Sequence, residues 1–276
     1  MSLGKLLKDT IHLQTSDLLV TPKITKFLQD NPGGLTLNRA RTSLSADSKR
    51  LVSYIMDKGF AGNEDRSGRF GASSRGTCLR AQVWTYLGMP SRKVQDVELS
   101  NLFNDGKYRH LRWQVMGMQS GALTDVELGI SDPSFRVTTS LDGVNDKEGF
   151  LFELKGDRRP TRMMDKVGAV DEKHRLQIHT MFLVSGYNRA SYIVEDKLSQ
   201  VWREVVVDED KAIMRQVVEE LDTLNEHVEQ RQMPEPLAAC KVKEGPYKSC
   251  PFAAPCIKRW NQQNDYFPDN PPDWES

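Results

Sequence analysis

The sequence predicts an α/β fold in which helices flank a central sheet, and three observations support this prediction. Residues 135–155 alternate apolar and polar side chains on either side of a polar turn, a pattern typical of a β-hairpin. Helical periodicity precedes the hairpin at 99–118 and follows it at 171–186. Two further runs, at 190–195 and 201–207, have the pattern of strands. Strand and helix patterns therefore alternate through the middle of the chain.

The N-terminal part predicts a helical elaboration, which we place at residues 1–72. A short helical pattern ends at the break Asn31-Pro32-Gly33-Gly34, and a second helix is expected to begin near Ser45. The segment 62–76 is rich in glycine and arginine, which predicts a flexible loop. Cys78 then opens an apolar-periodic helix.

The second strand of the hairpin carries two charged side chains on one face. Glu153 and Lys155 lie two residues apart, so both leave the same side of the sheet, and Asp142 lies near the end of the first strand. Two charged groups on an apolar strand have a desolvation cost. A bound metal ion or phosphate would offset this cost. The alternative is an edge strand with a solvated ion pair.

The remaining patterns complete a core domain, placed at 73–232, and a C-terminal cap at 233–276. A strand is expected at 124–130, and a polar loop should follow the hairpin after Lys155. A charged amphipathic helix is predicted at 208–232. The cap is Pro-rich, which predicts irregular structure, and it contains three of the four cysteines.

Composition limits the classes of partner and the compartment. Lys+Arg and Asp+Glu are each 38 among 276 residues, so a nucleic-acid partner would need a local basic groove. No apolar stretch approaches the ~20 residues of a membrane span, and the first residues lack the apolar centre of a signal peptide. We therefore expect an intracellular, cytoplasmic protein. Its cysteines would then be metal ligands or free thiols rather than disulfides.

Two carboxylates and a histidine in this region would form a mixed oxygen and nitrogen ligand set. His110 shares a helix face with Gly106, a glycine that would let another backbone approach closely. With Asp142 and Glu153 it would suit Mg²⁺ or Mn²⁺. Such an ion lowers the pKa of a bound water and neutralises charge on a phosphodiester. The alternative for His110 is a buried core histidine.

These residues resemble a known nuclease signature. Asp142 followed by Glu153-x-Lys155 looks like the PD-(D/E)xK motif, and Gly106-x-x-x-His110 resembles the metal-binding histidine of RecB-type nucleases. Gln177 matches the glutamine of the RecB-type Q-x-x-x-Y motif. With the one-plus-three cysteine arrangement, the chain resembles the iron–sulfur RecB-like nucleases, such as CRISPR-associated RecB-type exonucleases, the AddB nuclease domain and phage-encoded relatives.

The resemblance implies a mixed sheet and metal-dependent exonucleolytic hydrolysis of DNA, single-stranded or with free ends, in a bacterial or phage setting. It implies work in recombination, repair, replication or CRISPR adaptation, as a homo-oligomer or with a recombination or replication partner. Lys155 would act on the water and the transition state, and Gln177 would position Lys155 or the substrate. The implied metal ligands are His110, Asp142, Glu153 and the carbonyl of Leu154.

The cysteines have a separate role in the resemblance, because four thiolates would hold a 4Fe–4S cluster. The implied ligands are Cys78, Cys240, Cys250 and Cys256. Such a cluster would close a loop of about 160 residues and remove unfolded-state entropy. Zinc is the competing occupant, but its sites usually pair cysteines as C-x₂₋₄-C, and no such pair is present. Unliganded buried thiols are the third alternative.

Several further side chains have either a functional or a structural interpretation. A phosphate-binding track is one interpretation of five arginines, and a solvated face is the other: Arg75, Arg80, Arg158, Arg159 and Arg162. His174 and His179 are expected on a helix surface, and Glu127 is expected to be exposed rather than near the metal. Met181 replaces the tyrosine of Q-x-x-x-Y, so Phe182 or Tyr187 would have to supply its contact.

Two other functions remain open from the residues alone. One is a DNA-binding module with an inert site on the same fold. The other is a structure-specific or restriction-type endonuclease.

Overall fold

The computed structural model describes residues 17–31, 46, 49–50, 53, 67–89, 97–157, 170–248, 250–261 and 267. Most of the helix expected from near Ser45 lies outside these residues, as do Arg158, Arg159 and Arg162. Among the described helices, none has the length and apolar character needed to cross a membrane.

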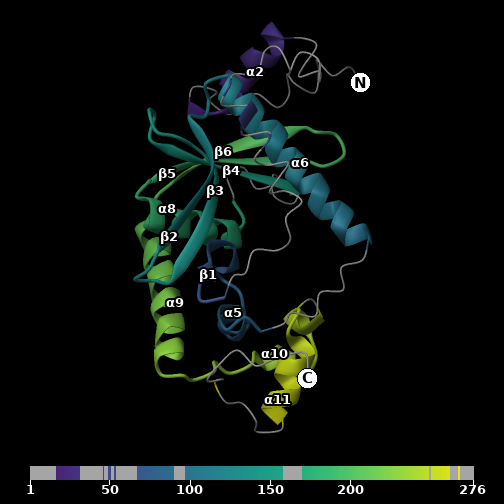
Figure 1. The fold of residues 1–276 in the computed structure, drawn as a ribbon, viewed down its shortest axis with the longest axis vertical. Helices are drawn as coiled ribbons and strands as arrows, with labels where there is room; N and C mark the ends of the chain where they lie inside the picture. The colour runs from purple at the N-terminus through teal and green to yellow at the C-terminus, as the bar shows by residue number, and fades with distance from the viewer. Residues whose placement is uncertain are drawn as a thin grey trace.

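A six-stranded mixed sheet forms the centre of the molecule, as predicted (Figure 1). Its main path runs β1 (Phe70–Gly71), β3 (Val137–Asn145), β4 (Phe150–Asp157), β5 (Arg189–Asp196) and β6 (Trp202–Asp208), and β2 (Asp125–Asp132) pairs with β3. The β1–β3 and β4–β5 pairs are parallel, whereas β2–β3, β3–β4 and β5–β6 are antiparallel. The predicted hairpin is thus β3–β4, and its turn covers 146–149.

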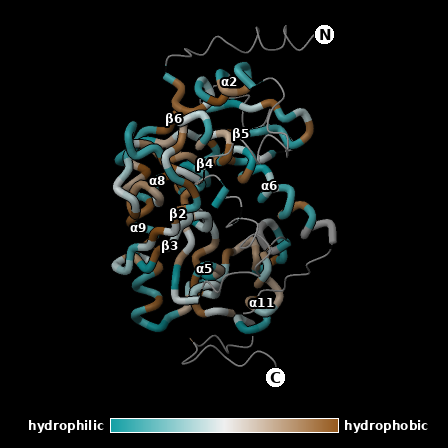
Figure 2. The backbone as a smooth tube through the Cα atoms, turned by 45° about the horizontal axis from the view of Figure 1, so that its top comes forward, coloured by the Kyte–Doolittle hydropathy of each residue, from teal (hydrophilic) through white to brown (hydrophobic). Residues whose placement is uncertain are grey.

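Helices cover both faces of the sheet, because strand side chains alternate between two cores. On one face Leu151 belongs to the core that includes residues of α8 (Glu172–Ser185). On the other, Phe150, Phe152 and Leu154 belong to the core formed with α6 (Val97–Gln119) and α2 (Thr21–Asp30). Figure 2 shows hydrophobic and hydrophilic residues interspersed along α6, as expected for a helix with one buried side.

The N-terminal helix α2 is anchored to the sheet by a buried carboxylate. Glu204 of β6 accepts hydrogen bonds from the backbone N–H groups of Leu19, Val20 and Thr21 at 2.8–3.0 Å and from the Thr21 hydroxyl at 2.7 Å. The first N–H groups of a helix need such acceptors, and a negative charge at this end is favourable. The helix is therefore part of the core that carries α6.

Two regions are more regular than their sequences suggested. Residues 70–74, within the expected flexible loop, form β1 and the 3₁₀ helix η2 (Ala72–Ser74), with Phe70 buried. The expected irregular tail holds α10 (Ala238–Lys241), η3 (Gly245–Lys248) and α11 (Ala253–Asn261). Its Pro255 lies in the first turn of α11, where proline is tolerated. Proline content alone was therefore a poor guide to the tail.

The remaining helices form a third core. Helix α5 (Leu79–Tyr86) begins at the N-cap Cys78, as predicted, and α9 (Lys211–Glu229) follows β6. Their apolar side chains pack together with Phe70 of β1. This core connects the sheet to the C-terminal cap, where α10 and α11 lie near α5 (Figure 1).

Candidate functional site

The candidate site lies where β3 and β4 separate. Their pairing ends at Gly143 and Phe152, so Asp142 and Glu153 face each other without ladder hydrogen bonds between them. Instead, the Leu154 N–H donates to Asp142 Oδ2 at 2.8 Å. We call this opening between the two strands the fork. It places the Asp142 carboxylate between strands that are otherwise tightly paired.

Three elements bring metal-ligating groups to the fork. His110 of α6 has Nδ1 3.1 Å from Asp142 Oδ1. Glu127 of β2 joins them, and ligand atoms of His110, Glu127 and Asp142 all lie within 4.8 Å of one another. The expectation that Glu127 is a simple exposed residue was therefore wrong. Gln114, one turn after His110, donates to Glu127 Oε1 at 2.6 Å and to the Asp142 carbonyl at 2.9 Å.

The backbone of Glu127 is itself unusual. Its φ is 53°, a left-handed conformation that costs a residue other than glycine about 1–2 kcal/mol. Strain of this kind concentrates at functional sites, because the surrounding structure must hold it in place. No local pattern in the sequence signals this conformation.

Glu153 and Lys155 lie beside these ligands, on the face of the sheet that α8 covers. Lys155 Nζ is 2.5 Å from Glu153 Oε1, and Gln177 of α8 donates to the same oxygen at 2.9 Å. Glu153 is buried, with 2% of its surface exposed. Gln177 therefore positions Glu153, whereas the sequence predicted that Gln177 would position Lys155 or the substrate. Leu154 was predicted to offer its carbonyl to the metal. In the structure its N–H donates a hydrogen bond to Asp142.

The charges at the fork are strongly coupled. Burial and the nearby Asp142 raise the pKa of Glu153 to about 7, against the opposing effect of Lys155. Burial would also raise the pKa of Asp142, but His110, Lys155 and the Leu154 N–H outweigh it and lower that pKa. Two facing carboxyl groups thus have pKa values shifted in opposite directions. Such pairs are characteristic of sites that bind cations or transfer protons.

The two basic groups of the fork respond to these carboxylates. Burial would lower the pKa of His110, but Asp142 and Glu153 raise it overall. Lys155 behaves in the same way, since Glu153 and Asp142 outweigh its burial. Both basic side chains therefore compensate the negative charge of the fork.

A histidine–tyrosine pair next to the fork was missed by the sequence analysis. His174, expected on the helix surface, is half-buried, and its Nδ1 is 2.7 Å from the Tyr192 hydroxyl. Tyr192 lies beside Glu153 in the β4–β5 register. Burial and the nearby Lys155 lower the pKa of His174 to about 4, so its imidazole is neutral at pH 7. The available signal was spacing, because His174 precedes Gln177 by three residues on one helix face.

Other predicted residues have structural roles. His179, also expected on the surface, is fully buried: its Nδ1 donates to the Arg175 carbonyl at 2.7 Å, and its Nε2 accepts from the Asp210 N–H at 2.9 Å. Gly106 has open space around it, so no backbone packs there in the described structure. The Tyr187 hydroxyl bonds to Asp146 at the hairpin turn, away from the fork.

The described arginines of the expected phosphate track are buried instead of exposed. Arg75, with 0% of its surface exposed, donates to Gln82 and lies 3.5 Å from Glu220. Arg80, 1% exposed, donates to the Pro234 carbonyl at 2.6 Å. A guanidinium held in this way cannot meet a phosphate at the surface. These two positions therefore provide no such track.

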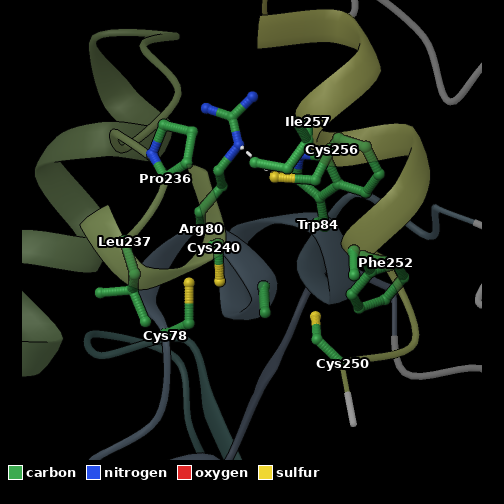
Figure 3. Close-up of a pocket in the computed structure, with 12 residues that line it drawn as sticks. Cys78, Arg80, Trp84, Pro236, Leu237, Cys240, Cys250, Phe252, Cys256 and Ile257 are labelled. Carbon is green, nitrogen blue, oxygen red and sulfur yellow. Dashed lines mark hydrogen bonds between the residues drawn. The ribbon is translucent and has the colours of Figure 1, made fainter. Parts of the chain in front are cut away.

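The four cysteines, remote in sequence, line one pocket with Trp84 and Ile257 (Figure 3). Arg80 Nε donates to Cys256 Sγ at 3.1 Å. Burial and repulsion from the neighbouring cysteines raise the pKa of Cys240. Among the described residues, the cysteine sulfurs form no group of three within 4.8 Å. A single zinc ion, with Zn–S bonds of about 2.3 Å, would hold tetrahedral sulfurs about 3.8 Å apart.

Comparisons with known proteins gave only distant similarities. No family model and no curated protein matches the chain. Two solved structures of LHK-Exo, an alkaline exonuclease from Laribacter hongkongensis, one of them in complex with dAMP, each have a TM-score of 0.45 and 17% identity. Each match covers 60% of this chain and 90% of LHK-Exo. SSO0001 has a TM-score of 0.44 and 12% identity, over 77% of this chain and 96% of its own.

Proposed function

We propose that this chain is a metal-dependent deoxyribonuclease that hydrolyses phosphodiester bonds. The observation that supports this is the convergence of His110, Glu127 and Asp142 within 4.8 Å, beside Lys155 and Glu153. One imidazole and several carboxylate oxygens suit Mg²⁺ or Mn²⁺. When bound, such an ion lowers the pKa of a water molecule and neutralises negative charge on the phosphodiester.

The side chains of the fork divide the remaining work. Lys155 presents a fixed ammonium group, which would donate to the attacking water or to a phosphate oxygen as negative charge develops. Glu153 holds Lys155 and, with a pKa raised to about 7, can exchange protons near neutral pH. Gln177 and Gln114 are positioning residues, because each contacts a carboxylate of the fork.

The form of the activity follows from the resemblance to RecB-like nucleases. We propose exonucleolytic degradation of single-stranded DNA, or of DNA with free ends, in the cytoplasm. The resemblance implies a role in recombination, repair, replication or CRISPR adaptation, as a homo-oligomer or with a recombination or replication partner. The motif residues that support it, Asp142, Glu153, Lys155, Gln177 and His110, meet at one place in the fold.

We propose that Cys78, Cys240, Cys250 and Cys256 hold a 4Fe–4S cluster. Their shared pocket supports this proposal. In a cubane cluster each thiolate binds a different iron, so the four sulfurs need not lie as close together as they would around one zinc ion. Bound iron would also stabilise thiolates whose pKa values burial raises. The cluster would join α5 to the cap as a structural link.

The nuclease proposal is tested with end-labelled single strands in Mg²⁺ or Mn²⁺. The wild-type protein should degrade them, and Lys155→Ala or Glu153→Ala should lower the rate at least about 100-fold, as expected when a transition-state donor is lost. Lys23→Ala is the control, since Lys23 pairs with Glu148 at an exposed position. Equal activity in the fork variants would refute the proposal.

Two further outcomes distinguish the alternatives. Cleavage of circular single-stranded DNA would indicate an endonuclease, because an enzyme that needs ends leaves a circle intact. Tight binding without cleavage under any divalent metal would indicate an inert DNA-binding module.

The cluster is tested separately by anaerobic purification. The protein should be brown and contain about four irons per chain. Colourless protein with one stoichiometric zinc would contradict the cluster and leave the nuclease proposal standing.

A further inference from the structure

Helix α6 has a buried half and an exposed half. Its C-terminal half packs against the sheet and α2, with Trp113 1% exposed and Met116 7% exposed. Its N-terminal half carries large side chains that face solvent, with Phe103 56% exposed and Tyr108 53% exposed. Figure 1 shows this half extending beyond the sheet. The aromatic groups there contribute nothing to the cores of the described structure.

The exposed half continues the helix face that carries the site. An α-helix turns about 100° per residue, so Phe103, Lys107, His110 and Gln114 share one face, and Tyr108 lies on the opposite side. We call Phe103, Gly106, Lys107 and His110 the lead-in stripe. At a rise of about 1.5 Å per residue, Phe103 lies about 10 Å along the helix from His110. A stacked single strand covers this distance in about three nucleotides, at roughly 3.4 Å each.

Gly106 lies between the aromatic ring and the histidine on this stripe. Among the described residues, none comes within 4 Å of where a Cβ atom at Gly106 would lie. Packing against the described part of the chain therefore does not explain a glycine in mid-helix, where glycine is less favourable than alanine. Its effect is to leave the helix surface low between Phe103 and His110, so that a flat group can approach the backbone.

The charge along the stripe is also suited to a polyanion. Lys107 carries the positive charge between Phe103 and His110 on this face. The nearby Asp105 points to another side of the helix, where Arg109 Nη2 donates to it at 2.9 Å. Among the described residues of this helix face, a phosphate backbone that follows the stripe meets Lys107 and no carboxylate.

We propose that the lead-in stripe binds an unpaired DNA strand on its way to the fork. A base stacks on the Phe103 ring, the strand passes over Gly106, and Lys107 contacts a phosphate. The inference rests on the proposed nuclease function and specifies its substrate, because a base within a duplex cannot offer its face to Phe103. Continuity with His110 favours a nucleic-acid strand over a protein partner on this surface.

The test measures strand binding without cleavage. Fluorescence anisotropy in EDTA compares a labelled single strand of about 16 nucleotides, the upper site size of a single-strand-binding fold, with a dinucleotide. Phe103→Ala should weaken binding of the long strand about 10-fold, since it removes one base–aromatic stack. Phe103→Trp should retain the affinity. Tyr108→Ala, an equally exposed aromatic on the opposite face, is the matched control and should bind like wild type.

The outcomes separate this inference from the nuclease proposal. If wild type cleaves DNA but Phe103→Ala binds the long strand as tightly as Tyr108→Ala does, the inference fails alone. If wild type neither cleaves nor binds any strand, both fail. If Phe103→Ala changes only the oligomeric state in sedimentation, the stripe is a surface for self-association and the inference is wrong.

Discussion

The fork and the cysteine pocket both gather residues that are distant in sequence, but they do so by different means. In the fork, the paired strands β2 and β3 and the helix α6 hold His110, Glu127 and Asp142 within 4.8 Å of one another. In the pocket, short helices and loops carry the sulfurs, which no strand pairing aligns. The fork is therefore organised by the fold itself. The arrangement of the pocket would depend on the cluster proposed for it.

The largest effect should come from neutralising the fork. Asp142→Asn keeps the shape of the side chain and an oxygen for the Leu154 N–H, but removes the charge that His110 and a metal ion need. Nuclease activity should fall by about 100-fold or more. The melting temperature at neutral pH should also fall, since the lowered pKa of Asp142 means that its charge stabilises the folded protein through His110 and Lys155. Asp208→Asn, at an exposed pair with Arg189, should retain activity.

The next effect should be confined to the cap. Cys78→Ser should abolish iron binding and lower the free energy of unfolding by up to about 4 kcal/mol, as for a covalent link across a long loop. Hydrogen exchange should then show lost protection in α10 and α11, while β3 and β4 stay protected. If protection fell equally in the sheet and the cap, the two regions would not differ in the way described.

A smaller effect should follow from crowding the contact between Gly156 of β4 and Arg109 of α6. A Cβ on Gly156 would lie 2.4 Å from Arg109 Nη1. Arg109 belongs to α6, the helix that carries His110, and its Nε lies 3.2 Å from Glu195 of β5. Gly156→Ala should cost about 1–3 kcal/mol of stability and lower kcat by displacing α6. Thermal unfolding and kinetics measure both. Gly129→Ala, in a strand position with open space, should leave both unchanged.

The smallest effect should appear as pH dependence. Burial lowers the pKa of His179, so the folded protein prefers its neutral imidazole. The stability it gives is present above the unfolded pKa of about 6.5 and is lost as the pH falls below that value. His179→Gln should therefore reduce the loss of stability between neutral and acidic pH, measured by urea denaturation. An unchanged pH profile would contradict this assignment.

The sequence predicted the sheet and the motif residues because periodicity and spacing are local. Asp142, Glu153 and Lys155 lie on one hairpin, so their proximity follows from alternation along two strands. Glu127 could not be found in this way, because its position depends on pairing between β2 and β3 and on a left-handed φ. Arg75 and Arg80 looked like surface cations because two of their partners, Glu220 and the Pro234 carbonyl, come from residues more than 100 positions away.

The central claim is that His110, Glu127 and Asp142 jointly bind a divalent ion at the fork. Anomalous diffraction from crystals soaked in Mn²⁺ tests it most directly. We predict a peak between these three side chains, at distances of about 2.0–2.2 Å, typical of small hard cations. Active protein whose crystals show Mn²⁺ elsewhere, with these side chains unliganded, would contradict the account.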